Sequence, residues 1–214
     1  MKKRNTILLI FLLLSILFII FIYSLAKAYS DYVFNNLSDS FIRFHVVANS
    51  NSTEDQIIKY KVRDKVMNYL SPFLKKAHNK TEALAIISTH LNELSCIAEG
   101  LIDEENIPYS VHVSIGKSYF PTKDYSSFVL PEGNYDALKI ELGKAEGQNW
   151  WCVMFPSVCI PQNEDVSTLD NSISTLENTL SSEEFSIISK SSNSVNVKIK
   201  FKLIELFENI WIML

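Results

Sequence analysis

The first 28 residues constrain the chain most, because they contain a hydrophobic segment of membrane-spanning length. Three basic residues follow Met1, and an apolar stretch then occupies residues 7–26. As a helix rising about 1.5 Å per residue, this stretch would be about 30 Å long, which is the hydrocarbon thickness of a bilayer. Basic residues before such a segment keep the N-terminus in the cytoplasm, so the rest of the chain is expected to lie outside it.

The sequence leaves two fates of this leader open. Ala26-Lys27-Ala28 has the small-x-small pattern that signal peptidase cleaves. The apolar part is longer than the roughly 7–15 residues of a typical signal peptide, which favours an uncleaved anchor. Residues 1–28 are therefore predicted to be a signal peptide or a membrane anchor, which crosses the membrane through residues 7–26 if uncleaved. Residues 29–40 are predicted to be a short stalk.

The remaining chain is acidic. Four of the 20 Lys and Arg residues lie in the first 28 positions and none of the 24 acids does, so residues 29–214 carry a net charge of −8. A nucleic-acid-binding protein needs a basic stripe that neutralises phosphates, and the sequence has none, so nucleic acid is not expected as a partner. Hydrophobic residues make up 47% of the chain and charged residues 21%, which indicates a packed core.

Helical patterns predict two helices after residue 52. Thr53-x-x-Gln56 matches a capping box that opens the first, and apolar residues recur at helical spacing to residue 73. Pro72 is expected to end or bend this helix near residue 70, because proline lacks the N–H that the helix needs. Thr81 is expected to cap the second helix, which residues 106–108 close.

Alternating patterns predict strands at residues 41–48, 109–115, 135–142 and 150–155. The last is apolar on both faces, which favours a central strand, and 117–133 is expected to be a long connection. The α+β domain is predicted over residues 41–161, followed by a polar linker over 162–193 with one helix at 181–188. Residues 194–214 are predicted to form a strand and a short apolar helix.

The predicted fold class is therefore α+β, with a mixed, largely antiparallel sheet, two helices packed on one face, and an N-terminal signal or anchor helix in front. The alternation places Arg43 and His45 on the other face of the sheet, with His112 as a possible neighbour. This second face is expected to be a surface where a partner can dock.

Two cysteines near the end of the domain are candidates for a disulfide. Six residues, including a Phe-Pro turn, separate Cys152 from Cys159, which is enough for the chain to fold back and bring the two Cα atoms together. Such a bond would persist outside the cytoplasm. The alternative is two reduced, buried thiols.

His45 and Cys152 raise the alternative of an extracytoplasmic hydrolase, either a cell-wall hydrolase or a cysteine peptidase, because a thiolate needs an adjacent base. No third, orienting group stands at a recognisable spacing. The four histidines also lack the spacing of metal ligands. The sequence therefore predicts no catalytic residue, no metal, no cofactor and no small-molecule substrate.

Adjacent tryptophans and a mixed loop are candidates for an interface. Trp150 and Trp151 point to opposite faces of a regular strand, so one can be core while the other anchors a partner. The segment 117–124 mixes aromatic and charged residues, which suits a recognition loop but is also common in ordinary loops.

Several of these residues belong to motifs that resemble the stage II sporulation protein R family. The motifs are Arg43-x-His45-x-x-Ala48-Asn49-Ser50, Ile115-Gly116-Lys117-x-Tyr119-Phe120-Pro121 and Gln148-Asn149-Trp150-Trp151-Cys152, in the family's order between residues 41 and 160. Asn51 departs from the family, whose members often have an acid there.

The resemblance implies a signal, not an enzyme. It implies a protein exported from the forespore into the intermembrane space, secreted or anchored by its N-terminal segment. There it would activate a membrane-embedded aspartic protease of the mother cell that processes pro-sigma-E. The residues expected to contact that partner are Arg43, His45, Asn49, Ser50, Lys117, Tyr119, Trp150 and Trp151.

Overall fold

The structure is a computed structural model that describes residues 2–125, 127–158 and 166–189, with side chains from 173 onward in the last range. The chain divides into two compact units. One contains the N-terminal residues to Asn36, and the other, Leu37–Ser191, contains the sheet.

The N-terminal helix α1 (Lys2–Ser40) confirms the predicted apolar helix and continues through the predicted stalk. Its apolar side chains are exposed throughout residues 7–22; Phe11, for example, is 72% accessible. Among the described residues, α1 is the one helix long and apolar enough to cross a membrane, judged by length and composition. Such a surface needs lipid or another apolar covering.

A mixed four-stranded sheet forms the centre of the second unit. Its strands are β1 (Ile42–Val47), β2 (Val111–Phe120), β5 (Gly133–Leu142) and β6 (Asn149–Phe155), in the order β2-β5-β1-β6. β1 runs parallel to β5, whereas the β2–β5 and β1–β6 pairs are antiparallel. This confirms the mixed, largely antiparallel sheet. The expectation that residues 150–155 form a central strand is wrong for the described sheet, in which β6 lies at an edge.

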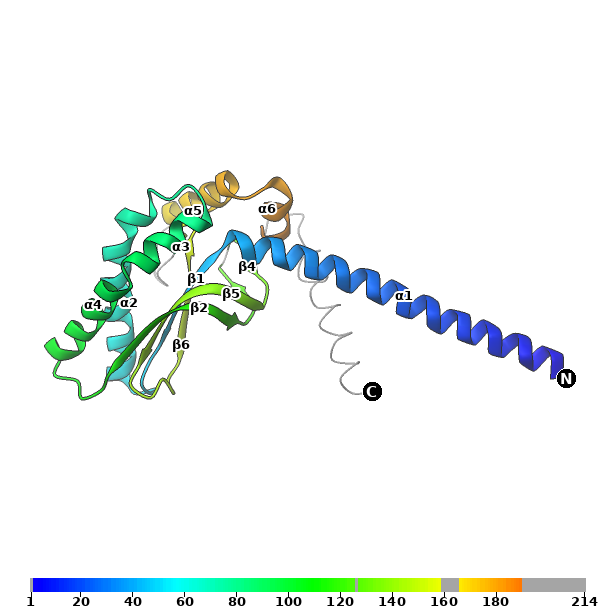
Figure 1. Cartoon of the computed structure of the whole chain (residues 1–214), viewed down its shortest axis with the longest axis horizontal. Coiled ribbons are helices and arrows are strands. Elements are labelled where there is room, and N and C mark those ends of the chain that lie inside the picture. Colours follow the sequence, from blue (N-terminus) through cyan, green and yellow to red (C-terminus); the bar gives the residue numbers. More distant parts are fainter. Residues whose placement is uncertain (1, 126, 159–165, 190–214) are drawn as a thin grey trace. The chain divides into compact units, whose positions relative to one another are not determined.

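Helices α2 (Thr53–Leu74), α3 (Lys80–Thr89) and α4 (Leu91–Glu104) cover one face of the sheet (Figure 1). They enclose the main core, in which alternate residues of β1 pack against the inner faces of the helices. The β1 members are Ile42, Phe44 and Val46, and the helical members include Val62, Val66, Leu70, Ile87, Leu94 and Ala98.

The helix ends differ from the predictions in detail. Ser52, not Thr53, caps α2, since its side chain accepts a hydrogen bond from Asp55 N. Pro72 lies inside the last turn without ending the helix there; its missing N–H removes a single hydrogen bond, the one to the carbonyl four residues earlier. Asn79, not Thr81, caps the next helix. That helix is interrupted at His90, so the predicted second helix is two, α3 and α4.

The segment between β2 and β5 also contains structure that the patterns did not indicate. β2 extends to Phe120, and β3 (Lys123–Asp124) pairs with β4 (Val129–Leu130) to form a small hairpin. The hairpin brings Tyr125 against Arg43 and Lys123 against Trp151, both on the second face of the sheet. The expectation of an open second face is therefore wrong around Arg43, which is fully buried.

Two helices, α5 (Val166–Thr179) and α6 (Ser182–Ile188), lie where a polar linker with one helix was predicted. α6 matches that helix and begins with a capping box between Ser181 and Glu184. The predicted C-terminal strand and helix over 194–214 lie outside the described residues.

Candidate functional site

The most unusual group in the domain is Arg43, a buried cation surrounded by aromatic rings. Its Cζ lies 4.4 Å from the Phe120 ring centroid and 5.0 Å from that of Tyr135. Nε donates to the backbone oxygen of Cys152 at 3.1 Å, and Nη2 donates to the Tyr125 hydroxyl at 2.6 Å. Nη1 is buried and has no hydrogen-bond partner among the residues that the structure describes. The ion pairs found among the described residues do not include Arg43.

His45 continues this cluster along β1. Its Nε2 lies 2.6 Å from Asn149 Oδ1, which can only accept, so this nitrogen carries the proton. Its ring stacks on Trp151 at a centroid distance of 5.6 Å, and it tilts against Phe120 at 5.7 Å. His45 Nδ1 is buried, and the described part of the chain offers it no hydrogen-bond partner.

Lys123 of the hairpin completes the cluster from outside the sheet. Its Nζ lies 4.2 Å from the ring centroid of Trp151, in a cation–π contact. Lys123 and Trp151 are partly buried, whereas His45 is 9% accessible and Arg43 is 0% accessible. Exposure therefore decreases from Lys123 and Trp151 to His45 and then to Arg43. We call these four residues the basic cluster.

The surroundings of the basic cluster disfavour the charged forms of Arg43, His45 and Lys123. Burial lowers the pKa of Arg43, and nearby tyrosine hydroxyls oppose this only in part. Burial also lowers the pKa of His45, against the hydrogen bond with Asn149. For Lys123, burial and then the charge of Arg43 both lower the pKa. Arg43 and Lys123 therefore carry their charges in surroundings that disfavour them, whereas His45 is shifted toward its neutral form.

Asn49 and Ser50, two of the residues expected to contact a partner, form hydrogen bonds within the chain. Asn49 Nδ2 and Ser50 Oγ both donate to Asp55 Oδ2, at 2.8 and 2.6 Å. Tyr109 donates to the other carboxylate oxygen at 3.1 Å. Burial alone would raise the pKa of Asp55, but these hydrogen bonds outweigh it and lower the value. These contacts fix the turn after β1.

The same turn is joined to the β5–β6 turn. Asn49 Oδ1 accepts from Lys144 N at 3.0 Å, and Ala48 O accepts from Gly147 N at 2.9 Å. Asn51 Oδ1, at the position where the resemblance leads us to expect an acid, accepts from Gln148 N at 2.8 Å. An aspartate could accept the same bond, so this departure preserves the contact.

The two tryptophans lie on opposite faces, as predicted. Trp150 faces the helices and is 6% accessible, with its ring edge-on to Tyr60 and under the guanidinium of Arg63 at 4.6 Å. Trp151 lies on the second face in the basic cluster. Trp151 is the more accessible of the two.

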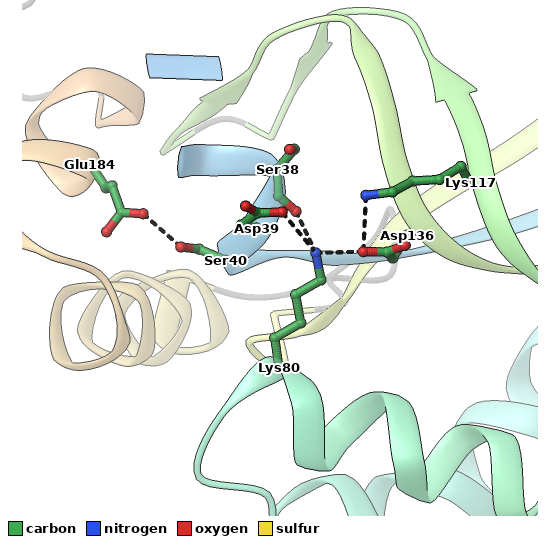
Figure 2. A network of polar contacts seen from close by, with 7 residues as sticks. All are labelled: Ser38, Asp39, Ser40, Lys80, Lys117, Asp136 and Glu184. Carbon is green, nitrogen blue, oxygen red and sulfur yellow. Dashed lines mark hydrogen bonds and ion pairs between the residues drawn. The ribbon is translucent and has the colours of Figure 1, made fainter. Parts of the chain in front are cut away.

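Lys117 and Tyr119 are exposed on β2. Lys117 donates to Asp136 Oδ2 at 3.1 Å, and the Tyr119 hydroxyl donates to Glu132 at 3.1 Å. Lys80 also contacts Asp136, at 2.6 Å, and donates to the backbone oxygen of Ser38 at 2.7 Å (Figure 2). Lys80 thereby links the last turn of α1 to the sheet.

The geometry does not support a Cys–His catalytic pair. Cys152 is opposite Phe44 in the sheet and belongs to the core on the helix face. His45 is opposite Trp151, so its side chain lies on the other face. Cys159 lies outside the described residues, so its disulfide with Cys152 stays a prediction. Among the residues that the structure describes, no three His, Cys, Asp or Glu side chains form a metal-binding group.

Sequence patterns missed the residues that surround Arg43. Tyr125 and Lys123 lie on the segment expected to be a connection, and Tyr135 was assigned only to a strand. The one sequence feature that pointed to this region was the mixture of aromatic and charged residues at 117–124. It indicated a recognition loop but not the sheet residue that the loop covers.

Comparisons with known proteins support one family. The stage II sporulation protein R (spore_II_R) family matches residues 38–165. Stage II sporulation protein R of Bacillus subtilis (strain 168) is 38% identical over 123 residues, which cover 58% of this chain and 55% of the relative. The matched region thus spans about half the length of that relative. No solved structure matches the chain.

The family match covers more than half of the chain, including all four strands of the sheet, the basic cluster and the turn fixed by Asp55. This chain therefore belongs to the stage II sporulation protein R family, and its role is in sporulation.

Proposed function

We propose that this chain is an exported sporulation signal that activates a membrane-embedded aspartic protease, which then processes pro-sigma-E. The observation that carries the proposal is the family match over residues 38–165. The protease acts on the partner side, and this chain contributes a folded surface.

The N-terminal helix supports the exported location. An apolar helix behind basic residues directs the following chain out of the cytoplasm, and α1 exposes its apolar side chains as a leader or anchor would. The domain would pass from the forespore into the intermembrane space, free after cleavage or tethered through residues 7–26.

The placement of Cys152 and His45 supports action by contact. A cysteine hydrolase needs its base within hydrogen-bond reach of the thiol, whereas these two side chains lie on opposite faces of the sheet. Cys152→Ala separates the two functions. A hydrolase would lose all activity, whereas a signal should lose only stability, because the substitution leaves a small gap in the core.

The exposed residues of β2 and the edge of the basic cluster are the proposed contact region. Lys117 and Tyr119 have exposed side chains, and Trp151 and Lys123 are partly accessible. By contrast, Asn49, Ser50 and Trp150 are engaged within the chain, which suits a supporting role.

The test is reconstitution in a non-sporulating bacterial host that expresses the protease and pro-sigma-E. Adding the full chain should convert pro-sigma-E to the shorter form, detected by immunoblot. A variant lacking residues 2–28, which stays in the cytoplasm, should not. Deleting the gene in the spore former should leave pro-sigma-E unprocessed. Normal processing in that deletion strain would refute the proposal.

A further inference from the structure

The basic cluster places two cations, Arg43 and Lys123, side by side in a domain that is otherwise acidic. Residues 29–214 carry a net charge of −8, yet Arg43 is buried and its Nη1 has no hydrogen-bond partner within the described ranges. The nearby acid Glu141 is engaged by Lys139 at 2.7 Å, and Asp124 follows Lys123 on the hairpin. A buried charge without a counter-ion is costly, so a group that supplies negative charge would be bound favourably.

The contacts show where such a group would enter. Lys123 and Trp151 are partly accessible, and the His45 ring stacks on Trp151. The Phe120 ring contacts both His45 and Arg43. A carboxylate at the edge would contact Lys123 directly, and the field of Arg43 would reach it through a low-dielectric interior.

We propose that the basic cluster is a carboxylate-binding subsite that receives an Asp, Glu or chain-terminal carboxylate of a protein partner. The chemistry favours a single carboxylate over a phosphate. One accessible ammonium beside an indole ring matches one negative charge, whereas a phosphate needs several donors arranged around it. The inference rests on the proposed function only for the identity of the partner.

The test uses the full chain in detergent micelles, titrated by calorimetry at constant ionic strength. The probes are an N-acetylated hexaglutamate peptide, the matching hexaglutamine peptide and inorganic phosphate. We expect saturable binding of hexaglutamate, which changes tryptophan fluorescence, and no binding of hexaglutamine. Lys123→Gln should weaken hexaglutamate binding by about tenfold, the usual effect of one charged hydrogen bond.

Lys65→Gln is the matched control, because it removes the same charge from an exposed lysine of α2 that pairs with Glu104. It should change hexaglutamate binding by less than about twofold, as a distant surface charge does in salt. Arg43→Gln should also weaken binding. If circular dichroism shows that this variant does not fold, Lys123→Gln decides alone.

Three results would overturn the inference: no saturable binding of hexaglutamate, equal losses in Lys123→Gln and Lys65→Gln, or tighter binding of phosphate than of hexaglutamate. The processing assay is independent of these titrations. If pro-sigma-E were not processed but hexaglutamate still bound, only the proposed function would be rejected. If pro-sigma-E were processed but hexaglutamate did not bind, only the subsite would be rejected.

Discussion

At the scale of single residues, Gly147 is placed where no side chain fits. A Cβ at this position would lie 2.2 Å from the backbone oxygen of Ser50. Gly147→Ala must therefore push apart the turns after β1 and β5, which Gly147 N joins by donating to Ala48 O. We expect a loss of about 1–3 kcal/mol in the free energy of unfolding, measured by urea titration.

Gly116 provides the matched control. It lies in the middle of β2, and an added Cβ would meet nothing within 4 Å. Gly116→Ala should leave the free energy of unfolding unchanged or raise it by about 0.5–1 kcal/mol, because alanine restricts the unfolded chain more than glycine does. Equal destabilisation by both substitutions would contradict this steric account of Gly147.

His45 should make stability depend on pH. Burial lowers the pKa of His45 in the folded chain, whereas the unfolded chain has a value of about 6.5. Below that pH the unfolded state binds more protons, so stability is highest above about pH 6.5 and falls as the pH drops. His45→Gln should reduce the difference in unfolding free energy between about pH 7.5 and pH 5.

His112 is the control for that measurement, because it is exposed on β2. His112→Gln should keep the wild-type difference between the two pH values. The charged neighbours that act on His45 are Lys139, Glu141 and Arg43. If His45→Gln kept the full wild-type difference, the pH dependence would have to arise elsewhere.

The candidate site could be predicted only in part. Alternation along β1 correctly placed Arg43 and His45 on one face, because side chains of a strand point to opposite faces in turn. It could not predict the hairpin that covers them, since Tyr125 reaches Arg43 from 82 positions away in the sequence. Likewise, a turn motif such as Asn49-Ser50 does not reveal which distant backbone groups it will bind.

At the scale of secondary-structure elements, long periodic segments were predicted well and short or interrupted ones were not. The positions of β1, β5 and α2 follow from their patterns. The β3–β4 hairpin has only two residues in each strand, too few to establish a period. The break at His90 was also missed, because the apolar stripe continues across it from α3 to α4.

Lys80 connects elements that the sequence does not place together. It pairs with Asp136 of β5 at 2.6 Å and donates to Ser38 O in the last turn of α1. A cation near the C-terminal carbonyls of a helix is favourable. Ser40 strengthens the junction by donating to Glu184 of α6 at 2.6 Å (Figure 2).

Lys80→Met should therefore loosen the end of α1. We expect a loss of about 1–2 kcal/mol in unfolding free energy, together with faster amide exchange at residues 38–41. Burial would raise the pKa of Asp136, but hydrogen bonds from Lys80 and Lys117 lower it. The contribution of this ion pair should be complete above about pH 4 and disappear as the pH falls further.

Lys76→Met is the control for Lys80→Met. Lys76 is an exposed lysine on the loop that leads to α3, and its removal should change the free energy of unfolding by less than about 0.5 kcal/mol. If amide exchange near residue 38 were the same in both variants, Lys80 would not fix the end of α1.

At the scale of the whole molecule, the leader and the domain differ in the surface they present. The apolar side chains of residues 7–22 are exposed, whereas the domain has its own core, formed by the sheet and helices α2 to α4. The unit 37–191 holds this core without any residue of the leader. The stability of the domain is therefore expected to be independent of residues 2–28.

A variant lacking residues 2–28 tests this independence. It should remain in solution without detergent and unfold at the same temperature as the full chain in micelles, because the apolar surface it loses lies outside the core. The full chain should aggregate when detergent is removed. Differential scanning calorimetry and light scattering measure the two properties. Aggregation of the shortened chain, or a midpoint lowered by more than about 5 °C, would mean that the domain depends on its leader for folding.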